Sequence, residues 1–205
     1  LRREQYRRAD DPQASADVAR SVLTGKIANS RTVLQRALRD HSDKMAADEV
    51  AFAAKRLSNH LDLLNQGQPL DSLRGCEGDA AHIYFSVFDH LIVAQKEDFS
   101  FQERNRRPPL DNVNALLSFI YTLLVHDIRS ALETVGLDPA VGFLHRDRPG
   151  RPSLALDLME EFRAFLCDRL ALSLVNRAQV EPDAFETTPV GGVIMTDAAR
   201  KIVLG

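Results

Sequence analysis

Hydrophobic residues along the first half of the chain recur at intervals of three and four, which is the period of an amphipathic helix. One such stretch covers residues 18–38 and a second covers residues 50–64, and both have polar opposite faces. A third begins at about residue 79 and keeps its apolar side chains on one face through Ile92. Residues with this spacing pack one side of a helix against a core. The pattern therefore predicts three helices before residue 95.

The second half begins with a polar, arginine-rich connector, Lys96 to Pro109, whose prolines and like charges predict a loosely packed loop. The longest apolar run follows, at residues 113–132, and predicts a central helix that ends before Gly136. Its length is about that of a membrane span, but it contains amide and charged side chains, which favour a bundle helix inside a protein. These polar residues are Asn114, His126, Asp127 and Arg129.

Pro152 opens another predicted helix, whose core-facing residues are expected to be Leu154, Leu158, Phe162, Phe165, Leu166 and Leu170. Strand signals are weak elsewhere, and only residues 190–195, with their two adjacent glycines, favour a short hairpin. A last helix starts at about Thr196. The expected fold is a single all-α domain over residues 1–205, a helical bundle with at most a short hairpin near its C-terminal end.

Composition narrows the chemistry that the chain can perform. Its 205 residues are enough for one buried core, and the 44% hydrophobic and 27% charged fractions are those of a soluble globular protein. The first eight residues are basic and amphipathic, unlike a signal peptide, so we expect a cytoplasmic protein with no membrane partner. The only cysteines, Cys76 and Cys167, are far apart and form no thiolate metal motif. Any metal site would use oxygen and nitrogen ligands.

Arginines gather in three clusters although the net charge is −3. Such clusters are either solvated faces that pair with acids or surfaces that bind phosphates, and their positions alone leave both interpretations open. The clusters are Arg2, Arg3, Arg7 and Arg8; Arg104, Arg106 and Arg107; and Arg146, Arg148 and Arg151.

Three segments could carry acid or metal chemistry. Glu77 lies between two glycines at the predicted mouth of a helix, and His145 ends an apolar tetrapeptide before an arginine-rich loop. Each of these alone is more often a structural residue. Asp157 and Glu160 are three residues apart, so they share one helix face, and their repulsion near a core calls for a cation. That cation could be Arg163 in a buried ion-pair network, or a metal. Two carboxylates and an imidazole suit Mn²⁺ or Mg²⁺.

Several segments, in the same order along the chain, together resemble the CRISPR adaptation integrase family, called Cas one. The resemblance covers residues 18–205 and includes Lys26 and Asn29 in an early Lys-Ile-Ala-Asn pattern. The segments that carry it are Gly75-Cys76-Glu77-Gly78 with Ala80-Ala81 and Tyr84-Phe85; Arg106-Arg107-Pro108-Pro109 with Asp111, residues 114–119 and Tyr121; Leu137-Asp138-Pro139 with Gly142-Phe143-Leu144-His145; and Gly150-Arg151 with Ser153-Leu154 and residues 157–163.

The resemblance implies an all-helical catalytic lobe in which Glu77, His145 and Glu160 bind Mg²⁺ or Mn²⁺. Asp157 would be a supporting catalytic acid. The family often has aspartate at the final ligand position, so the choice between Asp157 and Glu160 as direct ligand stays open. The resemblance also implies that a group of arginines grips backbone phosphates of DNA, namely Arg104, Arg106, Arg107, Arg148 and Arg151.

The function implied by the resemblance is that of a metal-dependent DNA endonuclease and integrase, which inserts protospacer DNA at a CRISPR repeat. Expected partners are double-stranded and branched DNA, a second copy in a homodimer, and the small partner nuclease Cas two. The family's β-rich N-terminal domain and final C-terminal helices are not in this sequence, so we expect the chain alone to integrate DNA poorly.

Two other classes of function remain open on the sequence alone. The same ligands could serve a metal-dependent nucleotide phosphohydrolase with a closed pocket. Alternatively, the chain could be a helical interaction module whose acids and His145 form a structural network without an ion.

Overall fold

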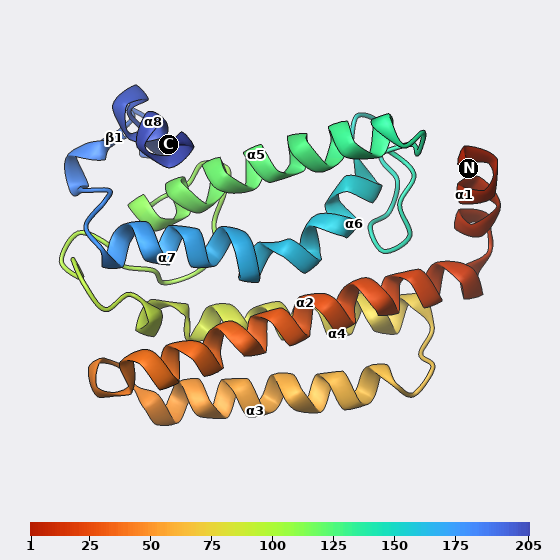
Figure 1. Cartoon of the computed structure of the whole chain (residues 1–205), viewed down its shortest axis with the longest axis horizontal. Coiled ribbons are helices and arrows are strands. Elements are labelled where there is room, and N and C mark those ends of the chain that lie inside the picture. Colours follow the sequence, from red (N-terminus) through yellow and green to blue (C-terminus); the bar gives the residue numbers. More distant parts are fainter.

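A long helix near the N-terminus organises the molecule. In the computed structural model, which describes residues 1–205, α2 packs along α3, α4 and α6, while α5 lies on the other side of α6 and α7 (Figure 1). The α-helices are α1 (Arg2–Asp10), α2 (Pro12–His41), α3 (Ala47–Leu64), α4 (Leu70–Ser86), α5 (Asn112–Thr134), α6 (Ser153–Phe162), α7 (Arg169–Asn176) and α8 (Asp197–Leu204). The all-α prediction is confirmed.

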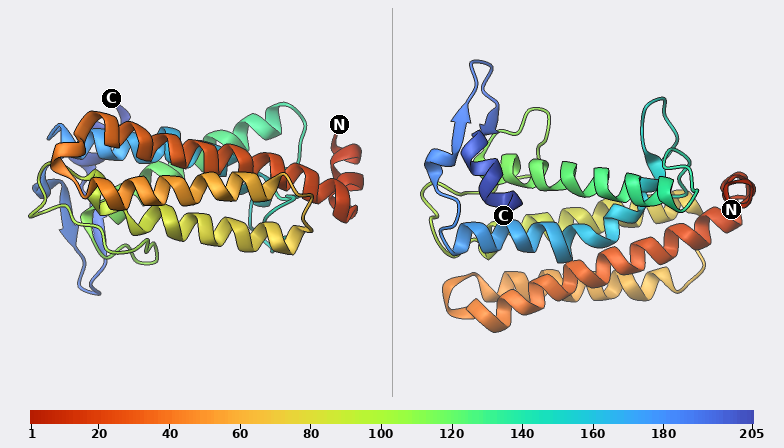
Figure 2. Two further views of the ribbon diagram at one scale, coloured as in Figure 1. Left: turned by 90° about the horizontal axis from the view of Figure 1, so that it is seen from below. Right: turned by 45° about the horizontal axis from the view of Figure 1, so that its top comes forward.

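Short elements complete the chain. A π-helical turn, η3 (Arg163–Asp168), joins α6 to α7, and 3₁₀ turns occur at η1 (Ser42–Lys44), η2 (Phe88–Leu91) and η4 (Pro182–Ala184). Strands β1 (Phe185–Thr187) and β2 (Val193–Met195) form one antiparallel hairpin, as predicted. This hairpin and α1 lie at opposite ends of the bundle (Figure 2).

Capping and burial explain why α2 and α5 form. Asp11 accepts hydrogen bonds from the backbone N–H groups of Gln13 and Ala14, and Pro12 occupies the first turn of α2. Asp111 caps α5 in the same way through the N–H of Asn114, at 2.7 Å. The buried faces of the two helices belong to one large core, to which they contribute Leu23, Ile27, Leu34, Val113, Leu116, Leu117 and Ile120.

The central helix α5 is the one helix long and apolar enough to cross a membrane, with a mean hydropathy of 1.3 over its most apolar window. In this fold its buried face packs into the bundle, against α6 and β2. The opposite face carries exposed His126, Asp127 and Arg129. The arrangement is that of an amphipathic bundle helix, as the polar residues in the run predicted.

The third helix begins earlier than predicted. It starts at Leu70 rather than near Asp79, so Glu77 lies inside α4 and not at its mouth. Glycine lowers helix propensity by about 1 kcal/mol, which made the Gly75–Gly78 segment look like a boundary. The burial of Leu73 against the core outweighs that cost.

The predicted core stripe after residue 160 is wrong. The buried face of this segment is a neighbouring helical face, on which Asp157, Glu160 and Ala164 repeat at intervals of three and four. Ala164, Cys167 and Asp168 become buried. The expected core residues Phe162, Phe165, Leu166 and Leu170 are instead exposed, by 37%, 47%, 45% and 37%.

The arginine-rich connector is more firmly held than predicted. Val193 in β2 donates its N–H to the carbonyl of Pro109 at 2.8 Å. Gly192 lies so close to Pro108 that an added Cβ would be 2.7 Å from the proline Cβ. The hairpin therefore fixes the proline end of the connector.

Two glycine substitutions test this packing. Gly192→Ala should lower the free energy of unfolding by about 1–3 kcal/mol, because the new methyl group overpacks against Pro108. Gly75→Ala is the matched control: it lies in α4 with no neighbouring atom within 4 Å of the added Cβ, and should raise stability by about 0.5–1 kcal/mol. Urea denaturation measures both changes, and a stabilising Gly192→Ala would contradict this packing.

Candidate functional site: a carboxylate and histidine cluster

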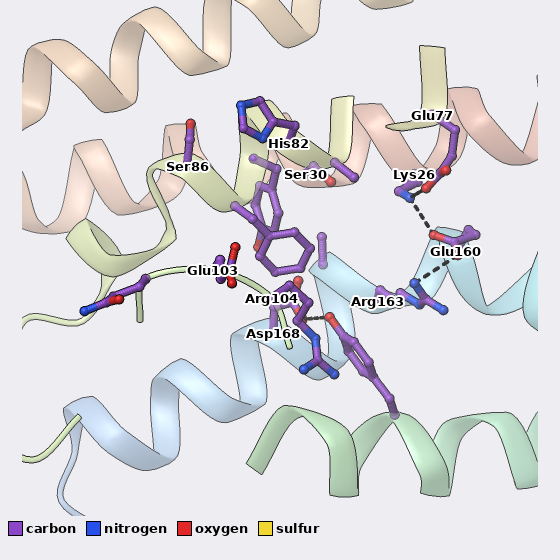
Figure 3. Close-up of a pocket in the computed structure, with 16 residues that line it drawn as sticks. Lys26, Ser30, Glu77, His82, Ser86, Glu103, Arg104, Glu160, Arg163 and Asp168 are labelled. Carbon is purple, nitrogen blue, oxygen red and sulfur yellow. Dashed lines mark hydrogen bonds and ion pairs between the residues drawn. The ribbon is translucent and has the colours of Figure 1, made fainter. Parts of the chain in front are cut away.

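Three helices bring two acids and a lysine together. Lys26 on α2 lies between Glu77 on α4 and Glu160 on α6 (Figure 3). Its ammonium contacts Glu77 Oε1 and lies 2.7 Å from Glu160 Oε2. The Glu160 side chain is only 1% exposed, whereas that of Glu77 is 30% exposed. The two carboxylates predicted to share an ion therefore meet, with a lysine between them.

Charge sets the protonation of this cluster. Burial alone would raise the pKa of Glu160, but the positive charges of Lys26 and Arg163 outweigh it and lower the pKa to about 2. Burial alone would lower the pKa of Lys26, but the charges of Glu160 and Glu77 outweigh it and raise the pKa above its ordinary value. Lys26 and Glu160 are therefore both charged at neutral pH.

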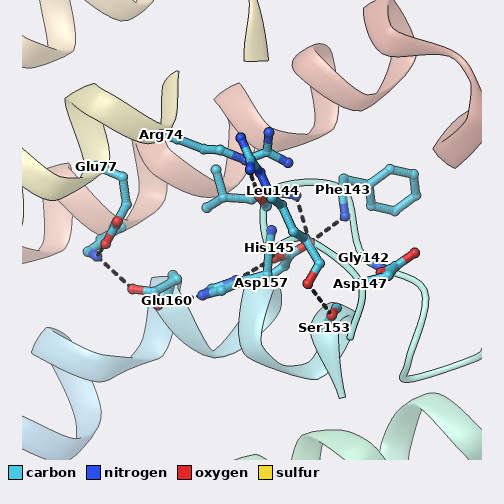
Figure 4. A network of polar contacts seen from close by, with 12 residues as sticks. Arg74, Glu77, Gly142, Phe143, Leu144, His145, Asp147, Ser153, Asp157 and Glu160 are labelled. Atoms are coloured by element: carbon cyan, nitrogen blue, oxygen red, sulfur yellow. Dashed lines mark hydrogen bonds and ion pairs between the residues drawn. The ribbon is translucent and has the colours of Figure 1, made fainter. Parts of the chain in front are cut away.

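His145 reaches the cluster from the loop before α6, and Asp157 holds it there (Figure 4). His145 Nδ1 donates to Asp157 Oδ1 at 2.7 Å. In the neutral imidazole, Nδ1 then carries the ring proton and Nε2 carries the lone pair, and Nε2 lies 3.9 Å from Glu160 Oε1. This is the pairing that orients a histidine for metal binding in many proteins.

Asp157 is committed to the loop. It is fully buried and accepts backbone N–H groups from three consecutive residues: Phe143 at 2.6 Å, Leu144 at 3.0 Å and His145 at 2.9 Å. With the imidazole as a fourth donor, each oxygen of Asp157 already accepts two hydrogen bonds. The geometry favours Glu160 over Asp157 as a direct ligand.

Gly142 makes this loop conformation possible. A Cβ at this position would lie 2.8 Å from Asp157 Oδ2 and 2.8 Å from the carbonyl carbon of Ser153. Only a residue without a side chain lets the loop backbone approach the carboxylate so closely. The glycine thus positions His145 indirectly.

Gln5 on α1 also supports the loop, although no pattern in the sequence predicts this role. Its side-chain NH₂ donates to the carbonyls of Asp138 and Val141, both at 2.8 Å, and its Oε1 accepts the N–H of Asp138 at 2.8 Å. Gln5 is only 5% exposed. A glutamine in a helix rich in arginine reads as a surface residue, and its partners lie more than 130 positions away.

A second polar group lies beside the first. Arg163 binds Glu160 Oε1 at 3.0 Å, and the guanidinium carbons of Arg104 and Arg163 lie 5.2 and 5.1 Å from the centre of the Tyr121 ring. The Tyr121 hydroxyl donates a hydrogen bond to Oδ1 of the buried Asp168. Burial raises the pKa of Asp168 to about 6, although hydrogen bonding by Tyr121 opposes the rise.

The two groups face a cavity of about 660 Å³. Lys26, Glu77, Tyr84, Arg104, Arg163 and Asp168 are among its lining residues. A neighbouring hollow of about 410 Å³ is lined by four arginines and no acid: Arg104, Arg106, Arg107 and Arg163. Such an excess of guanidinium groups favours an anion.

The predicted DNA-binding arginines differ from one another. Arg106, Arg107 and Arg148 are exposed. Burial together with the positive charges of Arg148 and Arg106 lowers the pKa of Arg151, so these three arginines lie in one positive region, and Arg107 lines the neighbouring hollow with Arg106. Arg104 was expected on a loosely packed loop, and that expectation is wrong. Its guanidinium donates to Asn114 Oδ1 at 2.6 Å and to Ser118 Oγ at 3.1 Å.

The donor set fits a divalent ion, although no group of three His, Cys, Asp or Glu side chains is arranged around one point. Lys26 lies between Glu77 and Glu160 and contacts both of them. Glu160 Oε2 is buried and accepts no well-directed hydrogen bond despite its contact with Lys26. Two carboxylates and a free imidazole nitrogen form a set that Mn²⁺ binds, or Mg²⁺ with more water.

The fold and site define an all-helical protein with a carboxylate and histidine cluster beside an arginine-lined cavity. Residues 1–205 match the family described as CRISPR associated protein Cas1. The CRISPR-associated endonuclease Cas1 1 of Chlorobaculum tepidum is 53% identical over 204 residues, covering 100% of this chain and 60% of that protein. The chain belongs to the Cas1 family.

Solved structures agree with the family. A casposase bound to an integration product has a TM-score of 0.82 at 27% identity, over 98% of this chain and 54% of that chain. A partial Cas6-RT-Cas1–Cas2 complex has a TM-score of 0.85 at 27% identity, over 98% of this chain and 59% of that chain. This chain therefore spans less than two thirds of each of these three relatives.

The raised pKa of Asp168 predicts a pH-dependent stability. Between pH 4 and 6 the folded protein keeps a proton on Asp168 that the unfolded chain releases, so this carboxyl makes folding less favourable as pH rises through that window. Asp168→Asn removes the effect. The free energy of unfolding of the wild type, minus that of Asp168→Asn, should fall by about 1–3 kcal/mol from pH 4 to pH 7.

Urea denaturation at each pH measures this difference. Tyr121→Phe is the companion variant: it removes the hydrogen bond that opposes the rise, so the transition should move to higher pH. A difference between wild type and Asp168→Asn that stays constant from pH 4 to pH 7 would show that Asp168 has an ordinary pKa.

Proposed function

We propose that this chain is the helical catalytic part of a metal-dependent DNA endonuclease and integrase that inserts protospacer DNA into a CRISPR array. The observation that carries the proposal is the approach of Glu77 and Glu160 to Lys26 in the wall of a cavity that Arg104 and Arg163 also line, with His145 Nε2 3.9 Å from Glu160. Membership of a family whose curated relatives are named endonucleases supports it.

Glu77, Glu160 and His145 Nε2 would hold the ion, which is Mg²⁺ or Mn²⁺. When bound, the ion would supply positive charge to the reacting phosphodiester. The chain's own residues perform the positioning: Asp157 fixes the tautomer and direction of His145, and Arg163 fixes one oxygen of Glu160. The reaction is a transesterification, in which a DNA 3′-hydroxyl displaces an oxygen of the target phosphodiester, or a hydrolysis, in which water does so. Neither needs a serine or cysteine nucleophile.

DNA would be held through its phosphates by arginines outside the cavity. Arg106, Arg107 and Arg148 are exposed and Arg151 is half-buried, and contact of this kind is independent of base sequence. Arg104 is tied to Asn114 and Ser118, so its contribution would be a fixed charge in the cavity wall rather than a mobile grip.

The proposed partners are protospacer and repeat DNA, including branched forms, a second copy of the protein, and Cas2. The casposase relative is bound to an integration product, and another relative is part of a complex with Cas2, which supports these choices. Joining two strand ends to two target sites requires paired active sites, hence the proposed homodimer. A cytoplasmic location is proposed with this function.

Substitutions in the cluster should separate cleavage from binding. Glu77→Ala, His145→Ala and Glu160→Ala should abolish Mn²⁺-dependent cleavage of branched DNA, while arginines continue to supply the affinity. Asp157→Ala should lower the rate by about 10–100-fold, the usual effect of losing a residue that orients a ligand. Gel-based cleavage assays and fluorescence anisotropy with the same DNA measure the two properties.

Two controls accompany these variants. Glu161→Ala removes an exposed acid beside Glu160 and should leave cleavage unchanged. The double variant Arg106→Gln and Arg107→Gln should weaken binding of unrelated DNA sequences equally and flatten its salt dependence. Full activity in His145→Ala would refute the site. If the Glu77, His145 and Glu160 variants are less stable than the wild type, and Mn²⁺ changes neither the cleavage nor the melting temperature of the wild type, the cluster is a structural acid and histidine network instead.

A further inference from the structure

Lys26 occupies one oxygen atom of each acid in the proposed metal site. Its ammonium contacts Glu77 Oε1 and Glu160 Oε2 (Figure 3). A divalent cation bound to the same two carboxylates would be repelled by this ammonium and would compete with it for their negative charge. Ion binding should therefore weaken the Lys26 ion pairs, and the ion pairs should weaken ion binding.

The charges support the same conclusion. Without an ion, Lys26 and Arg163 balance Glu77 and Glu160, which leaves the buried cluster close to neutral. Removing Lys26 alone would leave two acids near the core with a single partner, which is costly. Adding a divalent ion while Lys26 stayed in place would create an excess of two positive charges. If the divalent ion replaces Lys26, the net charge around Glu77 and Glu160 stays closer to neutral than if both cations were present.

The lysine also has space to leave. Its side chain is 10% exposed and lines the 660 Å³ cavity together with Ser30, one turn further along α2. A lysine has a flexible four-carbon stem, so its ammonium can turn into the cavity while α2 stays fixed. Arg163, the other cation, is held over Tyr121 and on the far oxygen of Glu160, so it is not the group that would move.

We propose that Lys26 is an internal counter-ion, which holds Glu77 and Glu160 together in the ion-free protein and is displaced into the cavity when a divalent ion binds. The proposal rests on the metal site of the proposed function. After displacement, the ammonium adds a positive charge to the wall of the cavity that would receive DNA.

The affinity for Mn²⁺, measured by isothermal titration calorimetry without DNA, tests this competition. Lys26→Met removes the competing cation, so the protein should bind Mn²⁺ about tenfold more tightly than the wild type. Its ion-free melting temperature should be lower, and the rise in melting temperature on adding Mn²⁺ should be larger. Lys96→Met is the matched control, because it breaks an exposed ion pair with Asp89 and should leave Mn²⁺ affinity unchanged.

A second measurement uses the wild type and does not depend on the folding of a variant. A buried, ion-paired ammonium exchanges its protons slowly, so the Lys26 Nζ group should give a ¹H–¹⁵N signal in ion-free protein. The signal is assigned by its absence in Lys26→Met. Saturating Mg²⁺, which is diamagnetic, should remove it as the ammonium enters the open cavity.

The outcomes separate this proposal from the function on which it rests. Mn²⁺ binding that is equal or weaker in Lys26→Met, or a Lys26 signal that persists in saturating Mg²⁺, overturns the counter-ion role and leaves the metal site standing. Absence of Mn²⁺ binding in both wild type and Lys26→Met overturns both. Tighter binding in Lys26→Met, with Lys96→Met unchanged, supports the displacement.

Discussion

Burial of three carboxylates on one nearly continuous helical segment is the constraint on which the site depends. Asp157, Glu160 and Asp168 are each at most 1% exposed, and a buried charge without partners is strongly unfavourable. Each of the three buried carboxylates is stabilised by different partners. Asp157 receives three backbone N–H groups and an imidazole, Glu160 receives a lysine and an arginine, and Asp168 receives a tyrosine hydroxyl and keeps a raised pKa.

The spacing of the three acids lets one helical segment present all of them inward. Asp157 and Glu160 are one turn apart, on the same face of α6. Asp168 is eight residues beyond Glu160, at the end of the π-helical turn Arg163–Asp168. The apolar side chains of Phe165 and Leu166 lie on another face and are exposed. The inward face of this segment thus carries acids in place of large apolar side chains, and it includes a π-helical turn of the kind that is frequent at functional sites.

Much of this fold could be predicted from the sequence, because helix period and caps are local signals. The helices around Leu23, Leu57 and Leu117 were found by their spacing, and the C-terminal hairpin by its two glycines. The start of α4 and the π-helical turn were missed, since tertiary burial decided both. At the site, the acids and His145 could be grouped through the resemblance to a family.

The contacts of the supporting residues could not be found in the same way, although Lys26 itself belongs to the resemblance. Lys26 sits among apolar neighbours of α2, and its acidic partners lie on two other helices, so no local pattern pairs them. The same is true of Gln5, whose partners belong to a loop more than 130 residues later. The mistaken view of Arg104 had a similar origin, because the amide of Asn114 that holds it is buried inside α5. Such contacts are determined by three-dimensional packing alone.

The contact of Gln5 with the loop before His145 has a consequence for the order of folding. Contacts between residues separated by 133 and 136 positions require the closure of a very long loop, whose entropy must be lost before the hydrogen bonds form. Neighbouring helices such as α2 and α3 are joined by a short turn and can pair early. The Gln5 contacts therefore form late, once the beginning of the chain has docked, whereas the bonds of Asp157 to the histidine loop span only 12 to 14 positions and can form before them. Docking of α1 would then complete a loop whose histidine is already oriented.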